Sequence, residues 1–116
     1  MRWVRLDTAF PRNHKVLALL AQRDGHRALV VYVCGLAYAG EQGTDGFVPA
    51  EALSLLHGRL ADAQRLAEVR LWHPQIGGWM INGWQEFQPS TKEAQERSTR
   101  ARSAAQARWD KHREAE

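Results

Sequence analysis

The order of patterns between Gly46 and Trp84 restricts the possible folds more than any other feature of this chain. Two short stretches with apolar residues at helical spacing lie close together, one after Pro49 and one starting at Leu60. His57-Gly58 separates them and predicts a tight turn. A Gly-Gly pair between two aromatic runs follows and predicts a β-hairpin. Helix, turn, helix and hairpin, in that order, make a winged helix-turn-helix.

The apolar spacing also predicts which side chains point inward. In the two helices these are Ala52, Leu53, Leu55 and Leu56, then Ala63, Leu66, Ala67 and Val69. The polar face of the second helix, which runs from Leu60 to Arg70, consists of Ala61, Asp62, Gln64, Arg65 and Glu68. We expect strands at 47–48, 71–73 and 79–82, with a loop at 74–78.

The segment before this stretch predicts two more helices. Residues 3–6 form either a short strand or an extended arm that lays Trp3 on the core. Asn13 is placed to cap a helix whose inward residues are Val16, Leu17 and Leu20. Residues 26–39 leave almost no polar face, which suits a buried core helix or a buried strand; the length of the run favours the helix, which Gly40 and Gly43 would end.

The last segment has a different composition. Ser90 and Glu93 form a capping-box pattern, and no Gly or Pro follows. Apolar content there is almost entirely Ala, so a helix in this segment would bury little surface. The predicted fold is therefore mainly α with a small β-hairpin, namely a winged helix-turn-helix domain at 1–89 and a basic C-terminal helix or tail at 90–116.

The charge distribution is compatible with a nucleic-acid partner. The chain of 116 residues has a net charge of +3 and a pI of about 9.5. Basic residues concentrate in 1–27 and 97–113, whereas the middle is balanced or slightly acidic. Cys34 is the only cysteine, which suits a reducing compartment. With neither a signal-peptide pattern nor an apolar run long enough for a membrane, a cytoplasmic protein is expected.

The second helix of the pair is the predicted reader of the DNA major groove. Gln64 and Arg65 are candidate contacts to adenine and guanine, and Arg59 is a candidate phosphate contact. The candidate face also includes Asp62 and Glu68, and the candidate wing contacts are Gln75 and Trp79. The alternative is a helical hairpin with a solvated polar face, which the two carboxylates favour because they repel phosphate.

The basic segments are candidates for sequence-independent phosphate contacts. They contribute Arg5, Arg12 and Lys15 near the beginning and Arg97, Arg100, Arg102, Arg108, Lys111 and Arg113 in the tail. The tail is equally compatible with a solvated helix containing Glu–Arg pairs, or with pairing to a second copy through its alanines. The wing carries no Arg or Lys, so it could also simply cover the core, with Trp72 and Trp84 buried and Trp79 undecided.

Enzymatic patterns are absent from the sequence. The five histidines are scattered, and the single cysteine lies in the most apolar stretch. We find no phosphate-binding glycine loop, nucleophile elbow or paired carboxylates. We therefore expect no catalytic residues, no metal and no cofactor.

A succession of short motifs resembles a known class of proteins. These motifs are Trp3-Val4-Arg5-Leu6-Asp7, His14-Lys15-Val16-Leu17, Thr44-Asp45-Gly46-Phe47-Val48-Pro49, Leu71-Trp72, Gly77-Gly78-Trp79-Met80-Ile81 and Trp84-Gln85-Glu86-Phe87-Gln88-Pro89-Ser90. They resemble the winged-helix N-terminal domains of phage replisome organisers and DnaD-type primosome proteins. The chain departs from that class at Arg70, where such domains often place Gly, and in its short length, which favours a regulator, an architectural factor or an accessory protein.

The resemblance implies binding to origin or operator DNA, self-association, and a role in mobile-element replication or gene control. The first hypothesis is thus a non-enzymatic protein that binds double-stranded DNA. The second is an interaction module that binds a host replication or transcription protein. The third is a homodimer or larger oligomer that coats DNA without reading bases.

Overall fold

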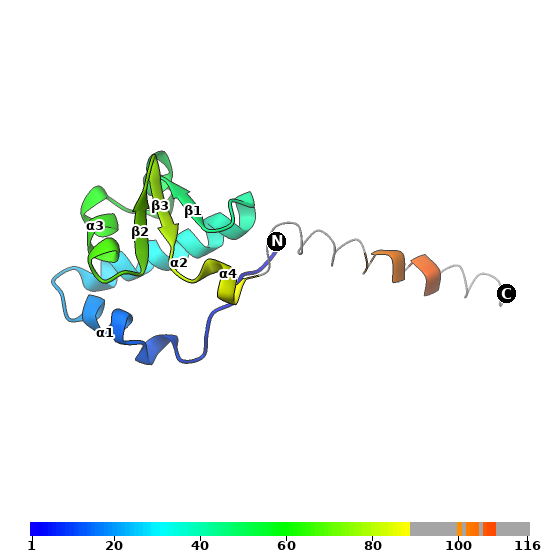
Figure 1. Ribbon diagram of the computed structural model, residues 1–116, viewed down its shortest axis with the longest axis horizontal. Coiled ribbons are helices and arrows are strands. Elements are labelled where there is room, and N and C mark those ends of the chain that lie inside the picture. Colours follow the sequence, from blue (N-terminus) through cyan, green and yellow to red (C-terminus); the bar gives the residue numbers. More distant parts are fainter. Residues whose placement is uncertain (89–99, 101, 105, 109–116) are drawn as a thin grey trace.

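The computed structural model describes residues 1–88, 100, 102–104 and 106–108, and its topology is that of a winged helix-turn-helix (Figure 1). The helices are α1 (His14–Leu20), α2 (Gly25–Gln42), α3 (Leu60–Glu68) and α4 (Trp84–Phe87), with 3₁₀ helices η1 (Phe10–Arg12) and η2 (Ala50–Leu56). The strands are β1 (Phe47–Pro49), β2 (Trp72–Gln75) and β3 (Gly78–Ile81). The predicted fold class is confirmed, and the described tail residues are helical and exposed. The predicted capping box at Ser90 and Glu93 lies outside the described residues.

The three strands form one antiparallel sheet in the order β1-β3-β2. β2 and β3 are joined by Ile76-Gly77 alone, because Gln75 already pairs with Gly78. The loop is therefore shorter than the predicted 74–78. A Cβ at Gly78 would collide with the carbonyl oxygen of Val48, so glycine at this position lets β1 and β3 approach each other.

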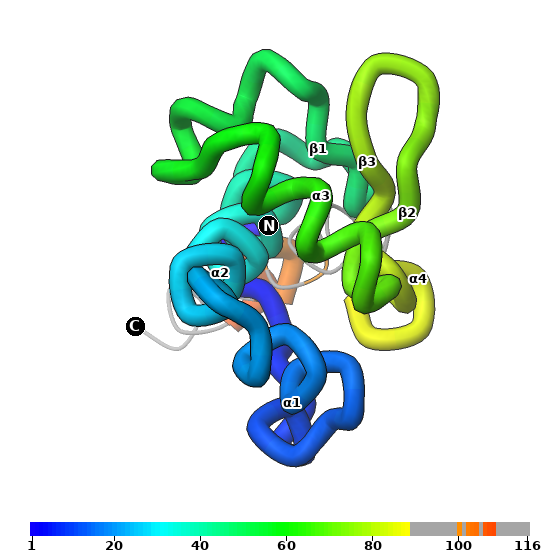
Figure 2. Tube along the Cα trace, turned by 90° about the vertical axis from the view of Figure 1, so that its left-hand side faces the viewer, coloured from blue at the N-terminus to red at the C-terminus, as the bar shows by residue number. Residues whose placement is uncertain are grey.

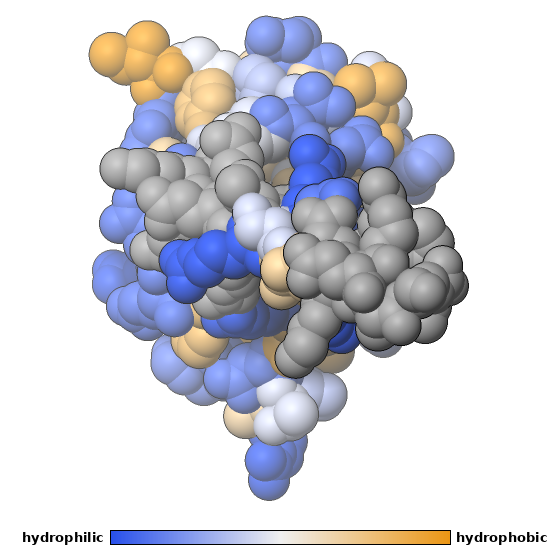
Figure 3. Space-filling view, turned by 90° about the vertical axis from the view of Figure 1, so that its right-hand side faces the viewer, coloured by the Kyte–Doolittle hydropathy of each residue, from blue (hydrophilic) through white to orange (hydrophobic). Residues whose placement is uncertain are grey.

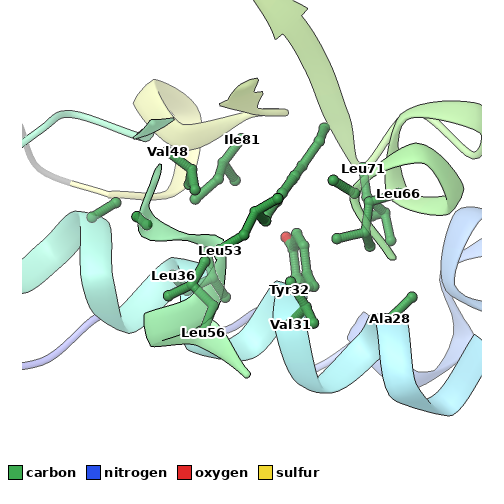
Figure 4. Close-up of a cluster of buried hydrophobic side chains, with 14 of the residues drawn as sticks. Ala28, Val31, Tyr32, Leu36, Val48, Leu53, Leu56, Leu66, Leu71 and Ile81 are labelled. Carbon is green, nitrogen blue, oxygen red and sulfur yellow. The ribbon is translucent and has the colours of Figure 1, made fainter. Parts of the chain in front are cut away.

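Helix α2 is the central element of the core, and the choice of a helix over a strand is confirmed. It begins after Asp24 and ends at Gly43, both of which are left-handed, with φ of 61° and 67°. Its buried face points toward η2, α3 and the sheet, where Val31, Tyr32 and Leu36 meet side chains from all three (Figure 4). On another side of α2, Val30 is 53% exposed.

Two inward-facing predictions were wrong, and for Leu55 the reason is that η2 is a 3₁₀ helix and not an α-helix. Leu55 is 69% exposed, whereas Ala52, Leu53 and Leu56 are buried. With three residues per turn in a 3₁₀ helix, residues 53 and 56 share one face and residue 55 points away. In α1, Asn13 caps the helix as predicted, but Leu19 is buried and Leu17 is exposed.

The N-terminal segment lies beside α4 without forming a strand (Figure 1). The side-chain amide of Gln88 bonds both backbone groups of Arg5: the Arg5 N–H donates to Oε1 at 2.8 Å, and Nε2 donates to the Arg5 carbonyl at 2.6 Å. The Met1 ammonium donates to the Gly40 carbonyl at 3.1 Å. Trp3 does not reach the core; it is 71% exposed, with the Arg2 guanidinium over its ring.

Candidate nucleic-acid interface

Helix α3 lies across α2, next to the hairpin, and presents one side to solvent (Figure 2). Gln64 and Glu68 are exposed on this side, and the Arg65 side chain is 26% exposed. A hollow of about 350 Å³ separates these residues from the α1–α2 connection, where Gln22 and Arg23 line its other wall. The structure therefore brings three of the predicted reading residues together on an accessible surface.

Asp62 does not belong to that surface, and its predicted contact with DNA was wrong. Its side chain is 0% exposed and points back toward the beginning of α3. Its Oδ2 accepts a hydrogen bond from the Arg59 backbone N–H at 2.8 Å and one from Arg27 Nε at 3.3 Å. As the third residue of α3, Asp62 caps the helix from within. One of the two carboxylates that argued against DNA binding is thus buried and compensated.

Three arginines from outside α3 lie near this helix, and one of them, Arg23, lines the hollow on its exposed side. Arg23 is exposed beside Gln64, the Arg27 side chain is 46% exposed where it meets Asp62, and Arg59 is exposed before the first turn. Sequence reasoning had included only Arg59 of these three. Arg23 and Arg27 both belong to the basic segment 1–27, but only the folded structure places Arg23 beside Gln64 and Arg27 against Asp62.

Arg65 already has a partner within the protein. Its Nη2 lies 3.9 Å from Asp24 Oδ2, and the Asp24 side chain is 51% exposed. An ion pair this long and this accessible to water contributes little free energy, about 1 kcal/mol or less. Arg65 can therefore leave Asp24 for a stronger acceptor at small cost.

The hairpin offers few contacts. Trp72 and Trp84 are buried, as predicted for a hairpin that covers the core. Trp79 is half-buried, and its ring lies 5.7 Å from that of Trp72 in a tilted arrangement, so it belongs to the packing more than to a free stacking surface. Gln75 remains exposed, and the tip residue Ile76 is fully exposed.

The predicted phosphate contacts near the beginning of the chain lie elsewhere. Arg5, Arg12 and Lys15 line a separate cavity under α2, which shares no lining residue with the hollow beside α3. In the tail, Arg100, Arg102 and Arg108 are helical and exposed. Arg97, Lys111 and Arg113 lie outside the described residues.

The described residues contain neither a cluster of metal-ligand side chains nor a helix that could span a membrane. No group of three or more His, Cys, Asp or Glu side chains there is placed to hold a metal ion. Within the same residues, no helix combines the length and the apolar character required to cross a membrane. In comparisons with known proteins, no family model, no curated protein and no solved structure matches the chain.

Proposed function

We propose that this protein binds double-stranded DNA without catalysing a reaction, with α3 as the element that enters the major groove. The observation that carries the proposal is the exposed polar side of α3, which has Arg23 beside it and Arg27 and Arg59 near the beginning of the helix, while Asp62 is buried. The proposed setting, which rests on the resemblance to phage replisome organisers, is replication initiation or transcription control in a phage or mobile element.

Groove dimensions and side-chain chemistry support this role. The major groove is about 12 Å wide and admits one helix with its side chains. Gln64 can form two hydrogen bonds to adenine, and Arg65 can do the same with guanine after leaving Asp24. Glu68 is the remaining carboxylate of this side, and it can accept only from the amino group of cytosine. We expect these three residues to select the site.

The arginines around α3 and in the tail would supply phosphate contacts. Arg23 and Arg59 are exposed, and Arg27 uses Nε for Asp62, which leaves its terminal nitrogens for phosphate. Each phosphate neutralised makes the logarithm of affinity fall by about 0.9 for each unit of log salt. Much of the affinity is therefore expected to be electrostatic, while α3 orients the protein.

Fluorescence anisotropy with labelled random and genomic duplexes at two salt concentrations tests the proposal. Gln64→Ala is expected to weaken binding to the preferred duplex by about 1–3 kcal/mol and to reduce the preference for that duplex over other sequences. Arg23→Ala should weaken binding to all duplexes alike, and the slope of log affinity against log salt should become smaller by about one. Gln85→Ala and Arg2→Ala, which change exposed residues away from α3, serve as matched controls.

Other outcomes would point to the alternatives. Loss of all binding on truncation after Gln88, with no sequence preference beforehand, would indicate coating through the tail. Absence of binding at low salt would contradict the proposal altogether. Self-association, which the resemblance implies, is measured on the same samples by sedimentation equilibrium.

A protein partner is the second candidate function, favoured by exposed apolar side chains around the helix-turn-helix. Leu55 is 69% exposed, Leu60 is 58% exposed and Ile76 at the wing tip is fully exposed. Figure 3 shows the side of the molecule opposite to that in Figure 2, and its coloured surface is mainly hydrophilic, with hydrophobic side chains at the upper corners. A host replication or transcription protein would use such residues as anchors. Replacing Leu55 and Leu60 by Ser should leave DNA binding intact if DNA is the target.

A further inference from the structure

A second cavity, of about 350 Å³, lies between the N-terminal segment and α1 on one side and the base of the hairpin on the other. Its walls are largely apolar and include Phe10, Leu36, Ile81 and Phe87. Phe10 stacks on Tyr32, with ring centroids 5.6 Å apart and planes at 9°. A volume of this size lies at the lower end of the range typical of small-molecule sites, which are mostly apolar with a few polar groups.

Two polar groups of the lining residues lack partners. Tyr32 is 8% exposed, and its hydroxyl takes part in no hydrogen bond among the described residues. Figure 4 shows that hydroxyl pointing away from α2. Trp84 is 4% exposed, and its indole nitrogen is likewise buried without a partner in the described part of the chain. Buried polar groups are usually hydrogen-bonded, so the unpaired Trp84 nitrogen beside this cavity indicates a missing partner, and the Tyr32 hydroxyl is available to the same partner.

The amide side chains that line the cavity already have hydrogen-bond partners. The cationic side chains are therefore the groups that could bind a charged ligand. Asn13 caps α1, Asn82 bonds His73 and Gln88 holds the Arg5 backbone. The side chains of Arg5, Arg12 and Lys15 have no ion-pair partner among the described residues. Arg5 and Arg12 are exposed and Lys15 is half-buried. Asp7 is the only carboxylate of the lining, and its Oδ1 accepts from the Ala9 N–H at 2.7 Å.

We propose that this cavity binds a small aromatic acid that carries a second polar group at the end of the ring system opposite to the acid. The acid group would lie among Arg5, Arg12 and Lys15, and the rings would lie against Phe10, Leu36 and Phe87. The second polar group would pair with the Tyr32 hydroxyl. An apolar wall, an excess of cations without ion-pair partners and a hydroxyl without a hydrogen-bond partner together match this chemistry better than a neutral or cationic ligand. The site is independent of DNA binding.

The ligand would also join two parts of the fold. One wall belongs to the N-terminal segment and α1, which the Gln88 clasp and the packing on α2 hold in place. The other wall includes Leu71, Ile81 and Trp84 at the base of the hairpin. A molecule in contact with both walls binds only the folded protein and therefore raises the melting temperature.

Isothermal titration calorimetry on the full chain tests the site with three related probes. These are 6-hydroxy-2-naphthoate, 2-naphthoate without the hydroxyl, and the neutral 2-naphthalenemethanol. We expect saturable binding of one molecule of either acid, and binding of the alcohol that is weaker by about tenfold or more, since the charge-assisted contacts are lost. This comparison needs no variant, so a folding defect cannot obscure it.

Two variants assign the contacts. Tyr32→Phe should weaken the binding of 6-hydroxy-2-naphthoate by roughly two- to tenfold, because one hydrogen bond is lost. The binding of 2-naphthoate, which has no hydroxyl, should be unchanged. The double change Arg12→Gln and Lys15→Gln should weaken the binding of both acids but not that of the alcohol. Arg23→Gln, in the hollow beside α3, is the control and should leave the affinity for all three probes unchanged. The proposal is overturned if no acid binds saturably, if the alcohol binds as tightly as the acids, or if Arg23→Gln has the same effect as the double change.

Discussion

Removal of the Asp62 carboxylate tests whether the beginning of α3 depends on a buried acid. The change Asp62→Ala deletes the acceptor for the Arg59 N–H, a capping interaction that contributes about 1–2 kcal/mol. The contact with Arg27 at 3.3 Å adds about 0.5 kcal/mol after discounting for solvent, because the Arg27 side chain is 46% exposed. Asp62 Oδ1 is buried without a partner in the described residues, so its removal offsets part of the loss. We expect a net cost of about 1–2 kcal/mol.

Urea denaturation followed by circular dichroism measures this cost directly. In a thermal scan, 1 kcal/mol corresponds to about 4–8 °C for a domain of 60–100 residues, so the melting temperature should fall by roughly 4–16 °C. Glu68→Ala removes an exposed carboxylate from the same helix and should change the free energy of unfolding by less than about 0.5 kcal/mol. Asp62→Asn keeps an acceptor for the Arg59 N–H, so its free energy of unfolding should lie between those of these two variants.

Equal stability of Asp62→Ala and Glu68→Ala would refute the reasoning. It would mean that Asp62 makes no buried contact and lies on the surface of α3 like its neighbours. Asp62 would then return to the groove-facing side as a repulsive charge, and its replacement by Ala would strengthen DNA binding. With Asp62 buried, the same replacement weakens or leaves unchanged the affinity for DNA.

Two further predictions concern the sheet and the cavity. Gly78→Ala places a methyl group against the Val48 carbonyl and should cost more than about 3 kcal/mol of unfolding free energy in chemical denaturation. Gly77→Ala has φ of 83°, but its methyl group would meet only Phe47 at an ordinary contact distance, so it should cost about 1–2 kcal/mol. Equal costs would show that β1 and β3 are not in close contact. Burial raises the pKa of Tyr32 above 10.0, so above about pH 10 the unfolded state loses this proton first and stability falls as pH rises. Tyr32→Phe should remove that part of the alkaline slope, and an identical slope in both proteins between pH 9 and 11 would contradict the burial.

The order of elements was readable from the sequence because each rests on local signals. Asn13 caps α1, Gly43 ends α2, and His57 at φ of 62° makes the turn before α3, all as the residue types indicate. The length and uninterrupted apolar character of α2 identified it as the core helix. The winged helix-turn-helix follows from these signals in sequence order alone. The same signals do not distinguish a 3₁₀ helix from an α-helix. The outward position of Leu55 was therefore not predicted.

The composition of the candidate site was decided by tertiary packing. Periodicity assigned Asp62 to the polar face, yet it is buried because a capping contact and Arg27, thirty-five residues earlier in the chain, draw it inward. Charge placed Arg5, Arg12 and Lys15 with the other phosphate contacts, whereas the clasp between Gln88 and Arg5 holds their segment beside a different cavity. Sequence patterns report the preference of each residue for its neighbours along the chain. Which distant charges meet, and which face stays open, depends on contacts that form only when the whole chain has packed.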